Sequence, residues 1–428
     1  MIYDIYTNNA TCPYCIKAKE LLDARGLNYA YHVVPKSTIE AKFPFATTVP
    51  QIVHNKVVIG GFEELKESLN TRTVFNKHNK GHETGEYKLF FGESLGFVDT
   101  INTPYPILDE LYQQQVSQLW NELEIDLTQD RQDMLSVPKE KTDLMVLNLL
   151  WQTLVDSIAN RSINSLLLEF VTNSDLEAWY NVTAFFETIH ARTYSHIIKQ
   201  TFTDPNEGLR KGYENKHIIA RAQPIIDAFD NLADIPKDAS MHDKKDAVYL
   251  AVVALYLLES VAFMASFAVT FGIAETGVFS GISQDVTLIC RDEMLHFQGG
   301  KEILKIQLKE DPHLANMRPQ IQELFDSILK AELEWTDYLF SEGRQCIGIT
   351  APLIKEYIHY LANPATELLG LKPLDNVPTD IPLHYMNDYM DSSRVQVAAQ
   401  ELQLTSYLVN AVTAVTETEL DNLLGEYR

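Results

Sequence analysis

Two segments of the chain, FFETIHARTY at residues 185–194 and ICRDEMLHFQ at residues 289–298, share the pattern Glu-x-x-His. Residues three apart lie on the same face of an α-helix, so each segment can direct a carboxylate and an imidazole toward one point. The two pairs are Glu187 with His190 and Glu293 with His296. A single Glu-x-x-His is usually part of a solvated helix face, whereas two copies in one chain predict the two halves of a metal site.

A further carboxylate precedes each pair within an apolar helical run: Asp156 in LLWQTLVDSIANRS, and Glu259 in LAVVALYLLESVAFMASFA. Asp156 lies 31 residues before Glu187, and Glu259 lies 34 residues before Glu293, spacings that suit helical hairpins. Bundles of the ferritin-like type build a two-metal site from such carboxylates and Glu-x-x-His pairs on four helices. Four carboxylates would balance two divalent cations, and buried charge persists only when it is compensated. We therefore predict an all-α, ferritin-like bundle around two metal ions.

The composition narrows the classes of partner. The 428 residues are enough for two or three domains, and the net charge of -24 disfavours nucleic acid and anionic membranes as partners. The chain has no Gly-x4-Gly-Lys-Ser/Thr loop for phosphates. Its four cysteines do not form a secreted disulfide framework, and no signal peptide precedes them. A reducing, cytoplasmic location is expected.

The run from Ala247 to Ala274 is apolar enough to raise the question of a membrane span. Glu259 and Ser260 interrupt it at the centre, and a carboxylate at that depth in lipid would be costly. No comparable second span or basic flank is found. We predict a buried helix of the bundle.

The N-terminal 75 residues have a different pattern. MIYDIYTNN alternates like a short strand and leads into Cys12-Pro13-Tyr14-Cys15 at the start of a helical stretch that ends at Gly26. LNYAYHVV predicts a second strand, TTVPQIVHNKVVIGG predicts two strands around a turn, and a closing helix follows from about Phe62. The order β-α-β-(α)-β-β-α, with Cys-x-x-Cys after the first strand, predicts an α/β thioredoxin-like domain at residues 1–75.

Within this domain CPYC, TVPQI and GGFEEL resemble glutaredoxin at the intervals of that family. A cysteine at a helix N-terminus favours its thiolate, so Cys12 is the predicted nucleophile and Cys15 the resolving thiol. The alternative for a bare Cys-x-x-Cys is half of a zinc site, but the chain lacks a second copy. The family has a cis proline at the position of Pro50, and more often has Asp-Asp where this chain has Glu63-Glu64. The resemblance implies a glutathione groove flanked by Tyr14, Val49, Pro50, Gly61 and Glu63.

Residues 76–88 are polar, with NKHNKGHETGE and no apolar periodicity, and predict a linker. Residues 89–394 predict the helical domain, and residues 395–428 predict a flexible acidic tail with a docking end. The expected helices lie near 107–122, 142–171, 175–202, 214–232, 243–274, 283–309, 316–342 and 351–362.

The helical domain resembles the radical-carrying small subunit of class I ribonucleotide reductase. The motifs that carry the resemblance are WQTLVDSIANRS, ETIHARTYSHII and CRDEMLH. The first ligand of this family is an Asp, which distinguishes the family from ferritins, where the first ligand is a Glu. The resemblance implies that one iron is held by Asp156, Glu187 and His190, and the other by Glu259, Glu293 and His296.

Tyr194 follows His190 by one helical turn, on the stripe that carries the predicted ligands. A tyrosine at such a position is usually core, but beside a di-iron pair the resemblance implies that it is oxidised to a radical. Phe263 and Phe267 fall on the matching face of their helix and would keep the radical dry. Asp292 would accept a hydrogen bond from a ligand histidine. The resemblance also implies that Trp120 begins electron transfer from the metals and that Tyr407, in the tail, passes the radical on.

These expectations combine into one function. The chain would join a glutaredoxin to a ribonucleotide reductase small subunit, act as a homodimer with a separate large subunit, and use glutathione as reductant. A di-iron oxidase or oxygenase, or a ferritin-like redox protein, is the alternative. Iron and manganese share these ligand types, so manganese is an alternative to iron at this site. Cys290 and Cys346 are expected to be core residues.

Overall fold

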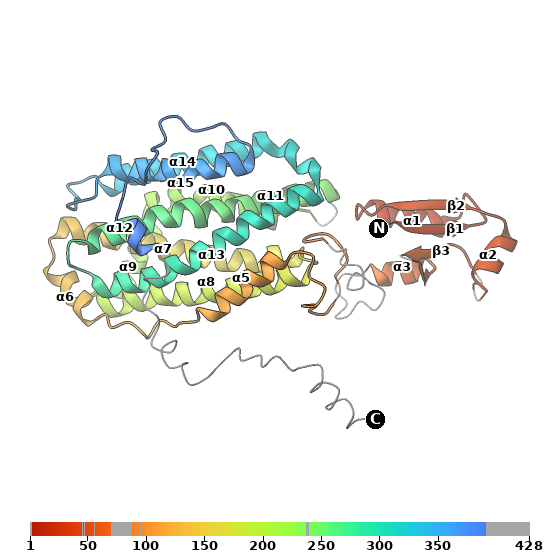
Figure 1. Cartoon of the computed structure of the whole chain (residues 1–428), viewed down its shortest axis with the longest axis horizontal. Coiled ribbons are helices and arrows are strands. Elements are labelled where there is room, and N and C mark those ends of the chain that lie inside the picture. The colour runs from red at the N-terminus through yellow and green to blue at the C-terminus, as the bar shows by residue number, and fades with distance from the viewer. Residues whose placement is uncertain are drawn as a thin grey trace, which may run out of the picture.

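The computed structural model describes residues 2–69 and 88–390, except residues 45, 47, 55, 95, 237 and 238 (Figure 1). The described residues form separate hydrophobic cores, which lie at Tyr3–Leu69 in the N-terminal unit and at Leu89–Met386 in the helical unit. The predicted linker up to residue 87 and the predicted tail, with Tyr407, lie outside the described residues. Lys88, at the end of that linker, lies 3.2 Å from the Asp311 carboxylate and so packs with the helical unit.

The N-terminal unit is a four-stranded mixed sheet in the order β2-β1-β3-β4. β1 pairs in parallel with β2 and antiparallel with β3, and β3 pairs antiparallel with β4. The predicted order of strands and helices and the α/β thioredoxin-like class are confirmed. The elements are β1 Tyr3–Thr7, α1 Pro13–Asp23, β2 Tyr29–Val33, α2 Lys36–Lys42, β3 Gln51–His54, β4 Val57–Gly60 and α3 Phe62–Ser68.

The helical unit is a bundle of long helices that lie side by side, with α8 and α13 beside α7 and α11 (Figure 1). Side-chain caps fix where several helices begin, because the first backbone N–H groups of a helix have no partner within it. Asn173 accepts from Leu176 N at the start of α8, and Asp130 accepts from Gly281 N and Ile282 N at the start of α13. The main helices are α5 Pro106–Ser117, α6 Thr128–Ser136, α7 Lys139–Ser165, α8 Ser174–Thr201, α9 Pro205–Glu214, α10 Lys216–Ala233, α11 Met241–Leu257, α12 Met264–Ala274, α13 Ser280–Glu310, α14 Arg318–Leu339, α15 Ala351–Leu369 and α16 Met386–Tyr389.

The apolar run forms α11 and α12, which are joined by a π-helical segment at Leu258–Phe263. By length and composition, Met241–Ala274 is the one helix among the described residues that could cross a membrane, and 89% of its most apolar window is buried within the bundle. The prediction of a buried core helix is therefore confirmed. The π-helical turn contains Glu259 and was not predicted, since its sequence is that of an ordinary helix.

Several predicted helix limits were wrong. α6 and α9 were not predicted, because both are short and largely polar. α5 ends at Ser117 rather than at residue 122, so Trp120 lies beyond the helix. α7 ends at Ser165 rather than at residue 171, and α15 continues past residue 362 to Leu369 with Pro364 inside it.

Candidate metal centre and thiol site

The six predicted metal ligands meet in one buried cluster that four helical elements supply. Asp156 comes from α7, Glu187 and His190 from α8, Glu259 from the π-helical segment, and Glu293 and His296 from α13. None is more than 2% exposed. Their possible ligand atoms fall into two groups, each within 4.8 Å, and Glu187 and Glu293 belong to both groups.

The distances show how the two glutamates are shared. His190 Nδ1 lies 3.1 Å from Glu293 Oε1 and 3.6 Å from Asp156 Oδ1. His296 Nδ1 lies 3.1 Å from Glu187 Oε1 and 3.4 Å from Glu293 Oε2. The sequence assigned each glutamate to one ion. In the structure Glu187 and Glu293 belong to both groups, so each could also contribute to the second ion.

The chemistry of the cluster fits two divalent cations. Buried polar atoms normally form hydrogen bonds, yet the carboxylate oxygens of Asp156, Glu187 and Glu293 and the Nδ1 atoms of His190 and His296 form none of regular geometry, although they lie close to one another. Carboxylate oxygens and imidazole nitrogens suit iron and manganese alike. Residues that bind metal are expected to direct such oxygen and nitrogen atoms toward one point.

The electrostatics of the cluster lead to the same conclusion. Burial raises the pKa of Asp156 and of Glu259 well above the ordinary range of carboxyl groups, and it also raises the pKa of Glu187. Burial opposes ionisation of Glu293 too, but the adjacent His296 and His190 outweigh it and lower the pKa of Glu293 to about 2. Four carboxyl groups this close together can all be ionised only if cations balance their charge.

Asp292 connects the cluster to Trp120. Its carboxylate accepts a hydrogen bond from Trp120 Nε1 at 2.7 Å and lies 3.1 Å from His190 Nε2. An ionised carboxylate can only accept a hydrogen bond, so the proton of His190 is placed on Nε2. Nδ1 then faces the cluster. Gln115, on α5, donates to the other Asp292 oxygen at 3.0 Å. Sequence reasoning missed Gln115, because nothing distinguishes it from the other polar residues of that helix.

Tyr194 lies on α8 one turn after His190 and is fully buried. Its hydroxyl has no hydrogen-bond partner, and burial, followed by the charge of Asp156, raises its pKa well above that of an ordinary tyrosine. Phe263 and Phe267 are also fully buried, and their rings stack with centroids 5.8 Å apart. The phenol is therefore neutral and sheltered from water.

The two N-terminal cysteines are free thiols at the start of α1. Cys12 is the N-cap, and its Sγ accepts from Cys15 N at 3.4 Å and lies 3.7 Å from Val49 O. The Val49–Pro50 peptide bond is cis, as the resemblance to glutaredoxin implied. Cys15 is fully buried, and burial, followed by the hydrogen bond with Cys12, raises its pKa to about 12. Burial therefore disfavours the thiolate form of Cys15.

The other residues of the predicted glutathione groove differ in their exposure. Tyr14 is 52% exposed beside Cys12, and its ring centroid lies 6.1 Å from that of Phe62. Glu63 is exposed, while Glu64 Oε2 accepts from Gly61 N at 2.8 Å. The Gly61 N–H is thus already bound within the chain. Among the groove residues, Tyr14 and Glu63 offer the more accessible groups.

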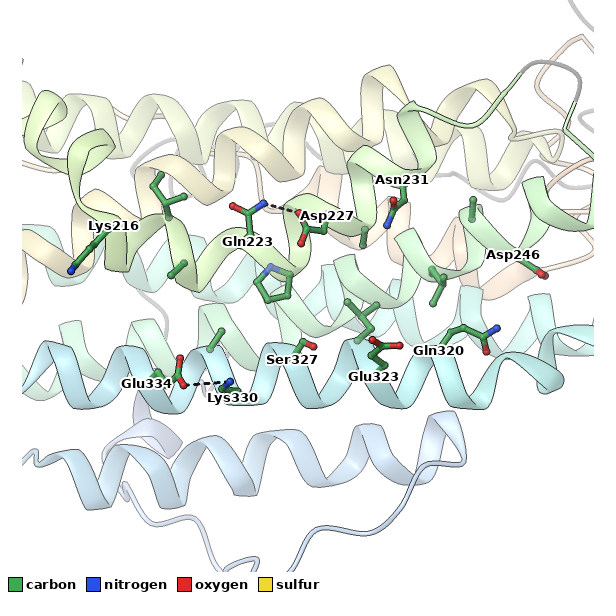
Figure 2. Close-up of a pocket in the computed structure, with 18 of the residues that line it drawn as sticks. Lys216, Gln223, Asp227, Asn231, Asp246, Gln320, Glu323, Ser327, Lys330 and Glu334 are labelled. Carbon is green, nitrogen blue, oxygen red and sulfur yellow. Dashed lines mark hydrogen bonds and ion pairs between the residues drawn. The ribbon is translucent and has the colours of Figure 1, made fainter.

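A surface groove of about 1200 Å³ lies between α10, α11 and α14 (Figure 2). Its lining includes none of the six predicted ligands. Two of its polar pairs lie within single helices: Gln223 with Asp227 at 2.7 Å and Lys330 with Glu334 at 3.8 Å. The groove is therefore not lined by the metal-capable cluster, whose residues are buried.

Comparison with known proteins gives the family. The family model described as "Ribonucleotide reductase, small chain" matches residues 98–381, and the model described as "Glutaredoxin" matches residues 4–59. The chain belongs to the ribonucleotide reductase small-chain family. It is 32% identical to the ribonucleoside-diphosphate reductase subunit beta of Haemophilus influenzae, over 81% of this chain and 97% of the relative. It is 27% identical to the corresponding subunit of Enterobacteria phage T4, over 75% of this chain and 91% of the relative.

Solved structures show the same helical fold. The ribonucleotide reductase R2 subunit of Clostridium botulinum aligns with a TM-score of 0.67 at 20% identity, over 74% of this chain and 98% of that chain. The dimanganese(II)-NrdF of Streptococcus sanguinis aligns with a TM-score of 0.56 at 21% identity, over 67% and 95%. The ferritin-like class of the bundle is thereby confirmed. Small chains of the ribonucleotide reductase family carry a di-metal site, work with a large subunit and are typically homodimeric.

Proposed function

We propose that the chain is a radical-generating small subunit with its own disulfide reductase. It would hold two iron ions, form a radical on Tyr194 and transfer it to a separate large subunit that reduces ribonucleoside diphosphates. The observation that carries this proposal is the sharing of Glu187 and Glu293 by two groups of possible metal ligands, with a buried tyrosine one turn after His190. Manganese would fit the same ligands.

Each metal ion would have one histidine and one terminal carboxylate. His190 and Asp156 would bind the first ion, and His296 and Glu259 the second, with Glu187 and Glu293 between them. When bound, the metals supply the oxidising power by reaction with oxygen. The protein keeps the ligands dry and fixes His190 through Asp292.

Oxidation of Tyr194 removes one electron and the phenolic proton. The residue has no exposed surface, which would keep water from quenching the radical, and the buried Phe263 and Phe267 would add to this apolar environment. The radical must also leave and return at each turnover. The hydrogen-bonded link from His190 through Asp292 to Trp120 would conduct the electron, and Tyr407 in the tail would complete the route to the large subunit.

The glutaredoxin domain would supply the reducing electrons. Each round of nucleotide reduction leaves a disulfide on the large subunit. The Cys12 thiolate would attack one sulfur of that disulfide, the Cys15 thiol would displace the product from the mixed disulfide, and two glutathione molecules would reduce the resulting Cys12–Cys15 bond. This chemistry requires a reducing compartment and agrees with the proposed cytoplasmic location.

A di-metal oxidase is the second candidate. R2-like ligand-binding oxidases with an Mn/Fe cofactor share the fold, with a TM-score of 0.52 at 17% identity. An oxidase of that kind would act on an organic ligand and would not need a radical path or a large subunit. The link between Trp120 and Asp292 therefore favours the reductase.

Reconstitution tests the proposal. The iron-loaded chain, mixed with a ribonucleotide reductase large subunit, should reduce ribonucleoside diphosphates with glutathione and glutathione reductase as the reducing system. Neither subunit alone should do so. Failure of the iron-loaded chain to support any large subunit of the family, with a chemical dithiol also present, would favour the oxidase.

A further inference from the structure

Arg221 is a buried cation on α10. Only 3% of the residue is exposed, and its guanidinium binds Glu332 of α14 in a bidentate manner, with Nε and Nη2 each 2.7 Å from a carboxylate oxygen. Burial lowers the pKa of Arg221, and the charge of Glu332 opposes that effect. Apolar residues often replace a buried ion pair without loss of stability, so stability alone does not account for this pair.

A third contact of Arg221 reaches the segment that carries a predicted metal ligand. Nη2 also donates to the carbonyl oxygen of Ala262 at 3.0 Å. Ala262 lies in the π-helical turn, three residues after Glu259. A π-helical turn has one more residue than an α-helical turn and is found mostly as a single turn at functional sites. A fixed donor at this carbonyl favours the wide turn over a regular helix.

Arg221 also contacts the helix of another ligand. Its guanidinium carbon lies 3.4 Å from the ring centroid of Trp151, which is on α7 five residues before Asp156. The Trp151 ring meets Phe263 edge-on, with centroids 5.8 Å apart. One guanidinium therefore connects α7, α10, α14 and the π-helical segment.

We propose that Arg221 is a positioning residue of the metal centre. It touches no predicted ligand and acts through Ala262, by holding the π-helical turn in the form that brings Glu259 to Glu187, Glu293 and His296. The inference rests on the proposed metal site and adds a residue to it. Without the hydrogen bond, the turn can relax to a regular helix, in which a shift of one residue rotates a side chain by about 100°.

The two metal groups should respond differently to the loss of Arg221. Glu259 belongs only to the group with His296, whereas the group with Asp156 and His190 does not include it. Arg221→Met should therefore lower the affinity for the second metal ion, the one that the group with Glu259 and His296 would bind, by about 10- to 100-fold. A loss of this size is expected for a residue that orients a ligand. The first equivalent should keep its affinity. Arg221→Lys should recover part of the second affinity, because an ammonium can still donate to the Ala262 carbonyl.

The probe is Mn²⁺. Electron paramagnetic resonance measures the free Mn²⁺, and the difference from the added Mn²⁺ gives the number of ions bound per chain. The measurement needs neither oxygen nor turnover. Arg344→Met is the matched control. Arg344 is likewise buried, and its guanidinium donates to the Leu339 carbonyl and to Glu342, beyond the end of α14. The Arg344→Met variant should bind both metal ions with the affinities of the wild type.

A double variant separates positioning from stability. In Arg221→Met with Glu332→Leu, both charges are replaced by apolar side chains, so the thermal midpoint should return toward the wild-type value while the second equivalent stays weak. Recovery of both equivalents in the double variant, or two unchanged equivalents in Arg221→Met, would overturn the inference. Wild-type protein that binds fewer than two ions would instead contradict the proposed metal site itself.

Discussion

Trp120 and Asp292 are joined by a buried hydrogen bond of 2.7 Å, although they are 172 residues apart in the chain. Asp292 also lies 3.1 Å from His190, and the Trp120 and His190 rings are 6.2 Å apart. Trp120 is 1% exposed. An oxidisable ring is therefore in hydrogen-bonded connection with a predicted metal ligand, as the export of a radical requires.

The first prediction concerns this connection. Trp120→Phe should keep both metals and the Tyr194 radical but lower nucleotide reduction with the large subunit by at least about tenfold. Phenylalanine has no N–H for Asp292 and is much harder to oxidise. Tyr249→Phe is the control, because Tyr249 is also a buried aromatic residue with a polar group but lies on α11. Normal turnover of Trp120→Phe would show that the radical leaves by another route.

The second prediction separates the two domains. Cys12→Ser should abolish nucleotide reduction driven by glutathione and its reductase, yet leave turnover intact when a chemical dithiol reduces the large subunit directly. Cys346→Ser should change neither, because Cys346 is a buried thiol of the helical unit. If Cys12→Ser kept glutathione-driven turnover with no other glutaredoxin present, the fused domain would not be the electron donor.

The third prediction concerns pH and stability. Burial, followed by the charge of Asp130, raises the pKa of Asp285 to about 8, and neither of its carboxylate oxygens has a hydrogen-bond partner. Between its ordinary pKa of 3.8 and about 8, the unfolded chain loses this proton and the folded chain keeps it. The unfolded state then binds fewer protons, so this group makes stability fall as pH rises, by up to about 1.4 kcal/mol per pH unit.

Asp285→Asn should remove that contribution. Its thermal midpoint, relative to the wild type, should therefore rise between pH 5 and pH 8, while Asp230→Asn, at an exposed position on α10, should show no such trend. A constant difference between Asp285→Asn and the wild type across this range would show that Asp285 does not titrate differently in the folded protein.

The convergence of four of the six predicted ligands could be predicted from the sequence, because helical geometry links spacing along the chain to side-chain direction. Glu187 and His190 must share a face of α8 wherever the helix packs, and the same is true of Glu293 and His296 in α13. The sharing of Glu187 and Glu293 between two groups could not be found in this way. It depends on how closely α8 and α13 approach, which no spacing along the chain specifies.

Three other features had either no local signal or a misleading one. The π-helical turn around Glu259 consists of ordinary helix-forming residues, so only packing and the Arg221 contact distinguish it. Arg221 and Glu332 lie on separate amphipathic helices, where a charged residue usually faces water. Pro364 predicts a helix end, but α15 continues through it to Leu369. In each case tertiary contacts outweigh the local pattern.

The central claim is that the metal centre forms a radical on Tyr194. The most direct test is electron paramagnetic resonance of the metal-free protein after anaerobic addition of two ferrous ions per chain and exposure to oxygen. The wild type should show a tyrosyl radical, and Tyr180→Phe should show it too, because Tyr180 is another buried tyrosine of α8 whose hydroxyl also lacks a partner. Tyr194→Phe should bind the same iron and show no radical, whereas an unchanged radical signal in Tyr194→Phe would show that the radical does not form on Tyr194.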